Sequence, residues 1–185
     1  VCSPLIDGDA LYVQAGGGIV KLDKRNGTSI WQSFADGGGM NGSAFSSPVI
    51  KTIHGKRQLV VQTRTELGGV DLVNGEILWR QAIPAFRGMN ILTPLVRGNR
   101  LFTSTYGGST QLWSLKEKFQ PSKIWDNKAQ GYMSSPVEVD EHVYLHLRNQ
   151  RMVCINLDQG ETTWTSPSSF GKYMSMITNG KKILA

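Results

Sequence analysis

The stretch DLVNGEILW, residues 71–79, decides the fold of this chain. It contains an Asp, a Gly four residues later and a Trp four residues after that, with an Asn-Gly pair at its centre. Asn-Gly between apolar segments is the strongest short signal for a β-hairpin, because both residues tolerate a positive φ. The stretch therefore predicts two antiparallel strands, at roughly 67–73 and 77–80, joined by a tight turn.

The same pattern recurs along the chain, which shows that the sequence is built from an internal repeat. A degenerate copy ends at Trp125, with Glu117 and Pro121 in the Asp and Gly positions. A Ser-Pro or Thr-Pro pair followed by an apolar residue opens each repeat, and the four prolines are spaced by 44, 46 and 42 residues. The repeat-motif residues are Asp23, Gly27, Trp31, Asp71, Gly75, Trp79, Trp125, Asn156, Gly160 and Trp164.

A period in the low forties that contains only strand-like segments is typical of a four-stranded propeller blade. In the second period the strands are expected at 48–53, 58–63, 67–73 and 77–80. We predict an all-β chain of four-stranded antiparallel β-propeller blades, about four of them plus the first strands of a fifth. The predicted repeats cover residues 3–45, 46–91, 92–133 and 134–172, and the next begins at 173–185.

The motif residues have a structural task in this interpretation. A blade sheet is apolar on both faces and must pack against its neighbours. A Trp near the outer strand can cover the backbone of the adjacent blade, and the Asp or Asn at the turn can accept hydrogen bonds from nearby backbone N–H groups. We therefore interpret the four repeat tryptophans as packing residues, and Trp113, in an apolar strand position, as part of the core.

The composition excludes several classes of protein. Charged residues make up 18% and hydrophobic residues 39% of the 185 residues, which is typical of a folded domain. No apolar run approaches the ~20 residues that span a bilayer, so no transmembrane segment is expected. The net charge is +6, but the lysines and arginines are scattered over the predicted turns, and we predict no nucleic-acid partner.

No catalytic or metal-binding motif stands out. Cys2 and Cys154 lie three repeats apart, too far for a disulfide, and are interpreted as buried thiols. His142 and His146 are about 13 Å apart on one predicted strand, too far to share a metal ion. Residues 37–42 match a dinucleotide-binding fingerprint, but no helix follows. We predict no catalytic, cofactor-binding or metal-binding residue in this chain.

The aliphatic-Asp-x-x-Asn-Gly-x-x-x-Trp segment, preceded by a Ser-Pro strand, resembles the tryptophan-docking repeat of PQQ-like, quinoprotein-type β-propellers. The resemblance covers the chain from Ser3 to Ala185. It is strongest to bacterial PQQ-binding-like repeat proteins, which are similar to the propeller lipoprotein of the outer-membrane assembly machine. It implies a ring of seven or eight blades, of which this chain would be a fragment, and a periplasmic or extracytoplasmic location.

This family includes both dehydrogenases and cofactor-free scaffolds. The enzymes carry an adjacent pair of cysteines over the quinone, an Asp base, and a Ca²⁺ held by Glu and Asn. None of these motifs can be matched to residues of this chain. The resemblance therefore implies no cofactor here and leans against an enzyme, with PQQ and Ca²⁺ as the alternative.

The loops indicate one candidate binding face. When the strands of a blade are lettered A to D, the B–C and D–A loops lie on the same face, and loops on a rigid scaffold often carry function. Aromatic, Met and Arg side chains there suit a protein interface. The candidate residues are Asn41, Arg64, Glu66, Arg87, Asn90, Tyr106, Tyr132 and Tyr173.

Three functions remain open from the sequence. The first is a non-catalytic scaffold in the bacterial cell envelope that binds another protein or a small ligand through this face. The second is a PQQ- and calcium-dependent dehydrogenase of alcohols or sugars, for which only the fold argues. The third is a carbohydrate or polyanion binder, which the basic charge favours. Loops that are merely solvated are the alternative to any binding face.

Overall fold

The computed structural model describes residues 2–37, 42 and 45–185, and almost all of its regular structure is β-strand. The first two sheets contain β1 (Leu5–Asp7), β2 (Ala10–Gln14), β3 (Ile19–Asp23) and β4 (Ser29–Ser33), then β5 (Val49–Ile53), β6 (Lys56–Gln62), β7 (Glu66–Asp71) and β8 (Ile77–Ala82). The next two contain β9 (Leu95–Arg97), β10 (Arg100–Ser104), β11 (Thr110–Leu115) and β12 (Pro121–Asn127), then β13 (Val137–Val139), β14 (His142–His146), β15 (Met152–Asn156) and β16 (Thr162–Thr165). A two-stranded sheet, β17 (Ile177–Thr178) and β18 (Ile183–Leu184), follows.

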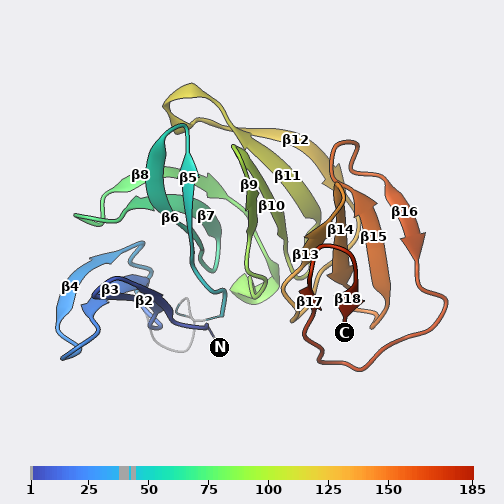
Figure 1. The fold of residues 1–185 in the computed structure, drawn as a ribbon, viewed down its shortest axis with the longest axis horizontal. Helices are drawn as coiled ribbons and strands as arrows, with labels where there is room; N and C mark the ends of the chain where they lie inside the picture. Colours follow the sequence, from blue (N-terminus) through green and yellow to red (C-terminus); the bar gives the residue numbers. More distant parts are fainter. Residues whose placement is uncertain (1, 38–41, 43–44) are drawn as a thin grey trace.

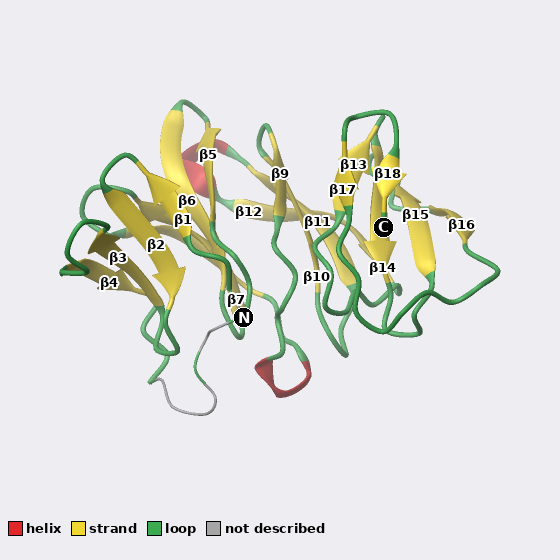
Figure 2. Cartoon of the chain, turned by 60° about the horizontal axis from the view of Figure 1, so that its bottom comes forward, coloured by secondary structure: helices red, strands yellow, loops and turns green. Residues whose placement is uncertain are grey.

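Each four-stranded sheet is antiparallel and keeps the order of the sequence, which confirms the predicted propeller blades. The sheets stand side by side like a fan, with the first strand of each blade on the inner side and the fourth on the outer side (Figure 1). The 3₁₀ helices η2 (Phe86–Gly88) and η3 (Glu117–Phe119) lie on opposite faces of the fan (Figure 2). The two faces of the fan are therefore built from different loops.

The hydrophobic core is divided into layers between successive blades. Tyr12, Phe34 and Leu59 belong to the layer between the first and second blades. Trp79 and Leu101 belong to the layer between the second and third blades, and further apolar residues fill the third layer. A single blade has no second sheet to cover it, so each blade is stable only because its neighbours bury both of its faces.

The turn between the third and fourth strands is organised by the Asp or Asn of the repeat. In the second blade, Asp71 Oδ1 accepts hydrogen bonds from the backbone N–H groups of Val73 (2.7 Å) and Asn74 (3.3 Å). The turn is longer than the predicted Asn-Gly hairpin, because β7 ends at Asp71 and β8 begins only at Ile77. The Asn-Gly pair lies in the turn between the two predicted strands, and of the two residues only Gly75 has a positive φ, of 78°.

The glycine of this turn receives the tryptophan of the preceding blade. Trp31 Nε1 donates to Leu72 O at 3.4 Å, and a methyl group on Gly75 would lie 2.8 Å from the indole. The last complete pair of blades repeats this contact, because Trp125 Nε1 donates to Leu157 O at 2.8 Å. A side chain at these glycines would therefore displace the neighbouring blade.

The interface between the second and third blades is built differently. Trp79 Nε1 donates to Gln58 Oε1 at 2.6 Å, inside its own blade. Gly69, which pairs with Trp79 across the sheet, makes this possible, since a methyl group there would lie 2.1 Å from Trp79 Nε1. His54 Nε2 instead makes the hydrogen bond to Leu115 O, at 2.7 Å. A histidine thus replaces the indole at this one docking position.

The third blade also has a longer turn than its neighbours. Trp79 follows its pair partner Gly69 by ten residues, whereas Trp125 follows its pair partner Leu112 by thirteen. The assignment of Glu117 and Pro121 to the Asp and Gly positions was therefore wrong, because three extra residues form η3 within this turn. No glycine is available there to receive an indole.

Candidate functional site

The B–C and D–A loops gather at one face of the fan, here called the loop face. Five side chains from four of these loops form a connected group, which we name the aromatic–arginine cluster. Phe86 and Arg87 come from the loop after β8, Tyr106 from the loop after β10, Tyr132 from the loop after β12 and Arg148 from the loop after β14. The cluster therefore exists only when three blades are assembled.

The contacts within the cluster link its three aromatic rings in series. The ring centroids of Phe86 and Tyr106 are 5.8 Å apart, and those of Tyr106 and Tyr132 are 5.5 Å apart. The guanidinium carbon of Arg148 lies 4.9 Å from the ring centroid of Tyr106, and that of Arg87 lies 5.2 Å from the ring centroid of Phe86. Both distances are within the range of a cation–π interaction. Arg87 thus lies over the first ring of the series Phe86, Tyr106 and Tyr132, and Arg148 lies over the middle ring.

Backbone and amide hydrogen bonds hold the loop that carries Phe86. Its backbone N–H donates to Tyr106 O at 2.8 Å. The buried side chain of Asn90 donates to Arg64 O at 2.9 Å and to Ile83 O at 3.1 Å. Phe86 itself remains 52% exposed. An aromatic ring that is both exposed and fixed in place loses little conformational freedom on binding.

The structure brings together some of the predicted face residues and separates others. Arg64 Nη2 donates to the backbone O of Arg87 at 3.1 Å, so Arg64 supports the cluster from below. Glu66 lies 3.5 Å from Arg80 on the outer strand, away from the cluster. Tyr173 is 65% exposed and lies at a separate cavity described below. Asn41 lies outside the described residues.

Sequence reasoning missed two members of the cluster, Phe86 and Arg148. Phe86 could have been noticed as the exposed-loop neighbour of Arg87. Arg148 lies in a four-residue polar stretch after β14 that carries no motif. Arg148 belongs to the cluster because it contacts Tyr106, which precedes it by 42 positions. The two residues are in neighbouring blades, the third and the fourth, so the sequence does not place them together.

A cavity of about 600 Å³ opens near the inner strands of the fan. Its lining is formed by the segments that precede the first strand of each blade and is rich in methionine, hydroxyl and aromatic side chains. Hydroxyl groups tie these segments together; for example, Ser46 Oγ donates to Leu92 O of the next blade at 2.8 Å. The lining residues that characterise it are Phe45, Met89, Met133, Tyr173, Met174 and Met176.

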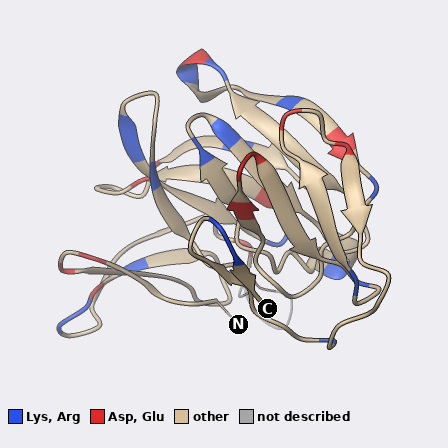
Figure 3. Ribbon diagram, turned by 45° about the vertical axis from the view of Figure 1, so that its right-hand side comes forward, with Lys and Arg blue, Asp and Glu red and all other residues tan. Residues whose placement is uncertain are grey.

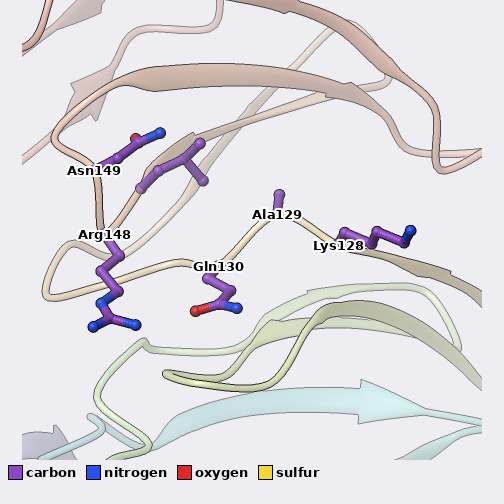
Figure 4. A pocket seen from close by; sticks show the side chains of 6 residues that line it. Lys128, Ala129, Gln130, Arg148 and Asn149 are labelled. Atoms are coloured by element: carbon purple, nitrogen blue, oxygen red, sulfur yellow. The ribbon is translucent and has the colours of Figure 1, made fainter.

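A second cavity of about 400 Å³ lies between the loops of the third and fourth blades. Gln130 and Arg148 point to one side of these loops, whereas Ala129 and Asn149 point to the other (Figure 4). Arg148 therefore faces Tyr106 and the aromatic–arginine cluster. The side-chain amide of Gln130, which also lines this cavity, points to the same side as Arg148 (Figure 4). Amide groups can donate and accept hydrogen bonds with a peptide backbone.

Three buried titratable side chains lie outside the aromatic–arginine cluster. Burial raises the pKa of the Cys2 and Cys154 thiols, both of which are free and buried. Burial lowers the pKa of His146, whose ring nitrogens lack a hydrogen-bond partner of normal geometry. A thiol held protonated is a poor nucleophile.

The described residues do not fit calcium-bound PQQ. Within residues 2–37, 42 and 45–185, no group of three His, Cys, Asp or Glu side chains could hold a metal ion. The described lining of the larger cavity offers no carboxylate for Ca²⁺ and no cation for a carboxylated quinone. In the same described part, no helix is long and apolar enough to cross a membrane.

Repeated four-stranded blades, docked through tryptophan and glycine, define a β-propeller of the PQQ-like repeat class. The chain belongs to the family described as outer membrane protein assembly factor BamB, whose model matches residues 1–166. This assignment confirms the predicted resemblance and supports the predicted periplasmic location in the bacterial cell envelope.

Individual relatives agree with this family. The outer membrane protein assembly factor BamB of Burkholderia pseudomallei (strain K96243) is 24% identical over 192 residues, which cover 95% of this chain and 44% of that protein. BamB from Moraxella catarrhalis has a similar crystal structure, with a TM-score of 0.69, 17% identity, and coverage of 88% of this chain and 47% of that chain.

A europium-containing methanol dehydrogenase is also similar in fold. Its TM-score is 0.60 at 11% identity, and the match covers 89% of this chain and 41% of that chain. At this identity the likeness shows the fold alone. The present chain therefore spans about half the length, or less, of the relatives named here.

Proposed function

We propose that this chain is part of a non-catalytic propeller scaffold that binds another protein through its loop face during assembly of outer membrane proteins. The family and the Burkholderia relative support a role in outer membrane protein assembly, because both are described as outer membrane protein assembly factors. The remaining blades of the ring, in this proposal, lie in further sequence of the same protein. Because the chain spans 44% of that relative, the role belongs to the whole protein and not to this part alone.

The observation that carries the proposal is the aromatic–arginine cluster. Tyr, Phe and Arg are enriched in protein interfaces, and Tyr and Arg are prominent among the residues whose truncation most weakens binding. Here four separate loops place five such side chains in one connected group. Packing within a blade does not require this arrangement, since Phe86 and Arg87 are exposed and belong to none of the three core layers.

The test is complementation of a deletion strain with full-length protein carrying Arg87→Ala and Tyr132→Ala together. We expect normal amounts of the variant, because both side chains lie in loops, and a loss of correctly assembled outer membrane proteins. The matched control is Lys181→Ala together with Lys182→Ala, on the opposite face. Full complementation by the loop-face variant would contradict the proposal.

No specific observation favours the dehydrogenase alternative. It rests on the similar fold of the methanol dehydrogenase, and a shared fold does not imply a shared activity. Titration of the full-length protein with PQQ and Ca²⁺ should therefore give no saturable heat. One-to-one binding at micromolar concentration would restore the dehydrogenase as the leading function.

A further inference from the structure

The two faces of the fan differ in charge. The loops of the loop face, as described between the strands from residues 15 to 176, contain six lysines and arginines but only one carboxylate, Asp36, a net charge of +5. The short turns of the opposite face contain six lysines and arginines and seven carboxylates, a net charge of −1. The cations of the loop face are Arg64, Arg87, Lys128, Arg148, Arg151 and Lys172.

The ion pairs follow the same division. Lys24 pairs with Asp9 within the turns, Arg100 at the start of β10 pairs with Asp158 of a turn, and Arg57 near the start of β6 pairs with Asp7 at the end of β1. Acidic and basic segments accordingly lie next to one another along several short turns (Figure 3). Among the described residues, no ion pair involves Arg87 or Arg148. The net positive charge of the described loops and turns therefore lies on the loop face.

We propose that the aromatic–arginine cluster is the docking site for an acidic, extended peptide segment of the partner protein. Carboxylates of the segment pair with Arg87 and Arg148, and its apolar or proline side chains lie on Phe86 and Tyr106. Arginines stacked on aromatic rings keep their N–H groups free for bidentate hydrogen bonds to carboxylates. The inference rests on the proposed function, to which it adds the chemistry of the partner.

The dimensions of the cluster suit an extended chain. Contacts of 5.2, 5.8 and 4.9 Å link Arg87 to Phe86, Phe86 to Tyr106 and Tyr106 to Arg148 in series. The two guanidinium groups are therefore at most about 16 Å apart, a distance that an extended peptide crosses in at most about five residues at ~3.3 Å per residue. Two carboxylates four positions apart on the same side of the peptide would therefore reach both arginines.

A peptide explains the site better than an anionic membrane surface. The charges are arginines ordered on rings, and the Gln130 amide lies beside Arg148, where a peptide backbone could bond to it (Figure 4). A membrane surface attracts basic segments through diffuse charge and needs no ordered row of rings. Anionic vesicles are therefore the competing ligand in the test.

The experiment measures fluorescence anisotropy of a short labelled peptide of Glu, Pro and Tyr residues with the full-length protein. A peptide with Gln in place of every Glu is the matched probe. We expect the Glu peptide to bind about tenfold more tightly than the Gln peptide, with an affinity that falls as the salt concentration is raised.

The protein variants test the two arginines. Arg148→Gln and Arg87→Gln should each weaken binding of the Glu peptide about three- to tenfold, and Arg148→Lys should weaken it by a smaller factor. Lys181→Gln, on the turn face, should have no effect. Thermal unfolding checks that each variant is folded.

The outcomes separate this inference from the proposed function. Equal binding of the two peptides, or equal effects of Arg148→Gln and Lys181→Gln, overturns the inference. Arg148-dependent binding of phosphatidylglycerol vesicles without peptide binding also overturns it, in favour of a membrane site. If the Glu peptide does not bind but Arg87→Ala with Tyr132→Ala still abolishes complementation, only the partner chemistry is wrong. If the peptide binds but that variant complements fully, the site stands and the proposed function fails.

Discussion

Two kinds of blade interface occur in this chain, and the difference between them follows from single residues. Between the first and second blades, Trp31 crosses to the next blade and lies on Gly75. Between the second and third blades, Trp79 remains over its own sheet, bonded to Gln58. The tryptophan is the same in both repeats, so its partners decide which way the indole lies.

The deciding partner is the residue that pairs with each tryptophan across the sheet. That residue is Lys21, Leu112 or Cys154 in the other blades, and each of these carries a side chain. In the second blade it is Gly69, which leaves the space of a side chain empty for Trp79. The lack of a side chain at Gly69 on β7 thus allows Trp79 on β8 to lie over its own sheet.

The largest effect is expected from Gly69→Ala. The new methyl group would lie 2.1 Å from Trp79 Nε1 and 2.2 Å from Gln58 Oε1, so the buried hydrogen bond between them must break. Overpacking and an orphaned buried acceptor together should lower the free energy of unfolding by about 3–5 kcal/mol. Urea unfolding of the full-length protein, followed by tryptophan fluorescence, measures the loss.

Gly8→Ala is the control for this substitution, because a methyl group at Gly8 would have no neighbour within 4 Å. Its cost should be limited to the strain of a positive φ, about 1 kcal/mol. A Gly69→Ala variant as stable as Gly8→Ala would show that Trp79 can adopt the docking of Trp31 at little cost.

The second effect concerns the docking glycine. Gly75→Ala places a methyl group 2.8 Å from the Trp31 ring, whereas Gly27→Ala, at the same motif position in the first blade, meets nothing within 4 Å. Both glycines have nearly the same φ, 78° and 75°, so their backbone strain is matched. We expect Gly75→Ala to lower the free energy of unfolding by about 1–3 kcal/mol more than Gly27→Ala does. Equal losses would mean that these glycines serve only the turn.

The fold was largely predictable from the sequence because its determinants are local. The repeat spacing and the Ser-Pro pairs predicted every end of the second blade's strands to within two residues. The length of the third-blade turn was not predictable from Trp125 alone, since only the pairing of Leu112 with Trp125 shows three extra residues.

The candidate site was predictable only in part. Loop composition pointed to Arg87, Tyr106 and Tyr132, which the structure does bring into one cluster through Phe86. The contact of Arg148 with Tyr106 depends on how two blades are placed in space, and no sequence period encodes it. The charge difference between the faces likewise becomes visible only once each loop is assigned to a face.

A third prediction extends the comparison to the last residue of the second strand in each blade. Gln14 and Gln62 occupy this position in the first two blades and bond to the following blade, whereas His146 in the fourth blade is fully buried without such a bond. Desolvation lowers the pKa of His146 from its ordinary value of 6.5. As the pH falls below that value, the unfolded chain binds a proton that the folded protein does not.

The free energy of unfolding should therefore decrease as the pH falls below 6.5 and be unaffected above it. The slope cannot exceed about 1.4 kcal/mol per pH unit for one group. His146→Gln restores the residue of the first two blades and should flatten this dependence in urea titrations at pH 5.0 to 7.5. A pH dependence that survives in His146→Gln would assign it to other groups.

The smallest effect is expected at His54, which takes over the docking bond where Trp79 does not reach. Its Nε2 lies 2.7 Å from Leu115 O, the carbonyl that corresponds by strand pairing to Leu72 O, and its ring contacts Phe119. His54→Ala should lower the free energy of unfolding by about 1 kcal/mol, the net value of one hydrogen bond. His142→Ala is the matched control, because its hydrogen bond to Asp140 O is local to its own turn. Equal effects of the two would mean that the His54–Leu115 hydrogen bond adds no net stability between the second and third blades, so that the apolar layer and the Gln62–Thr103 contact hold this interface.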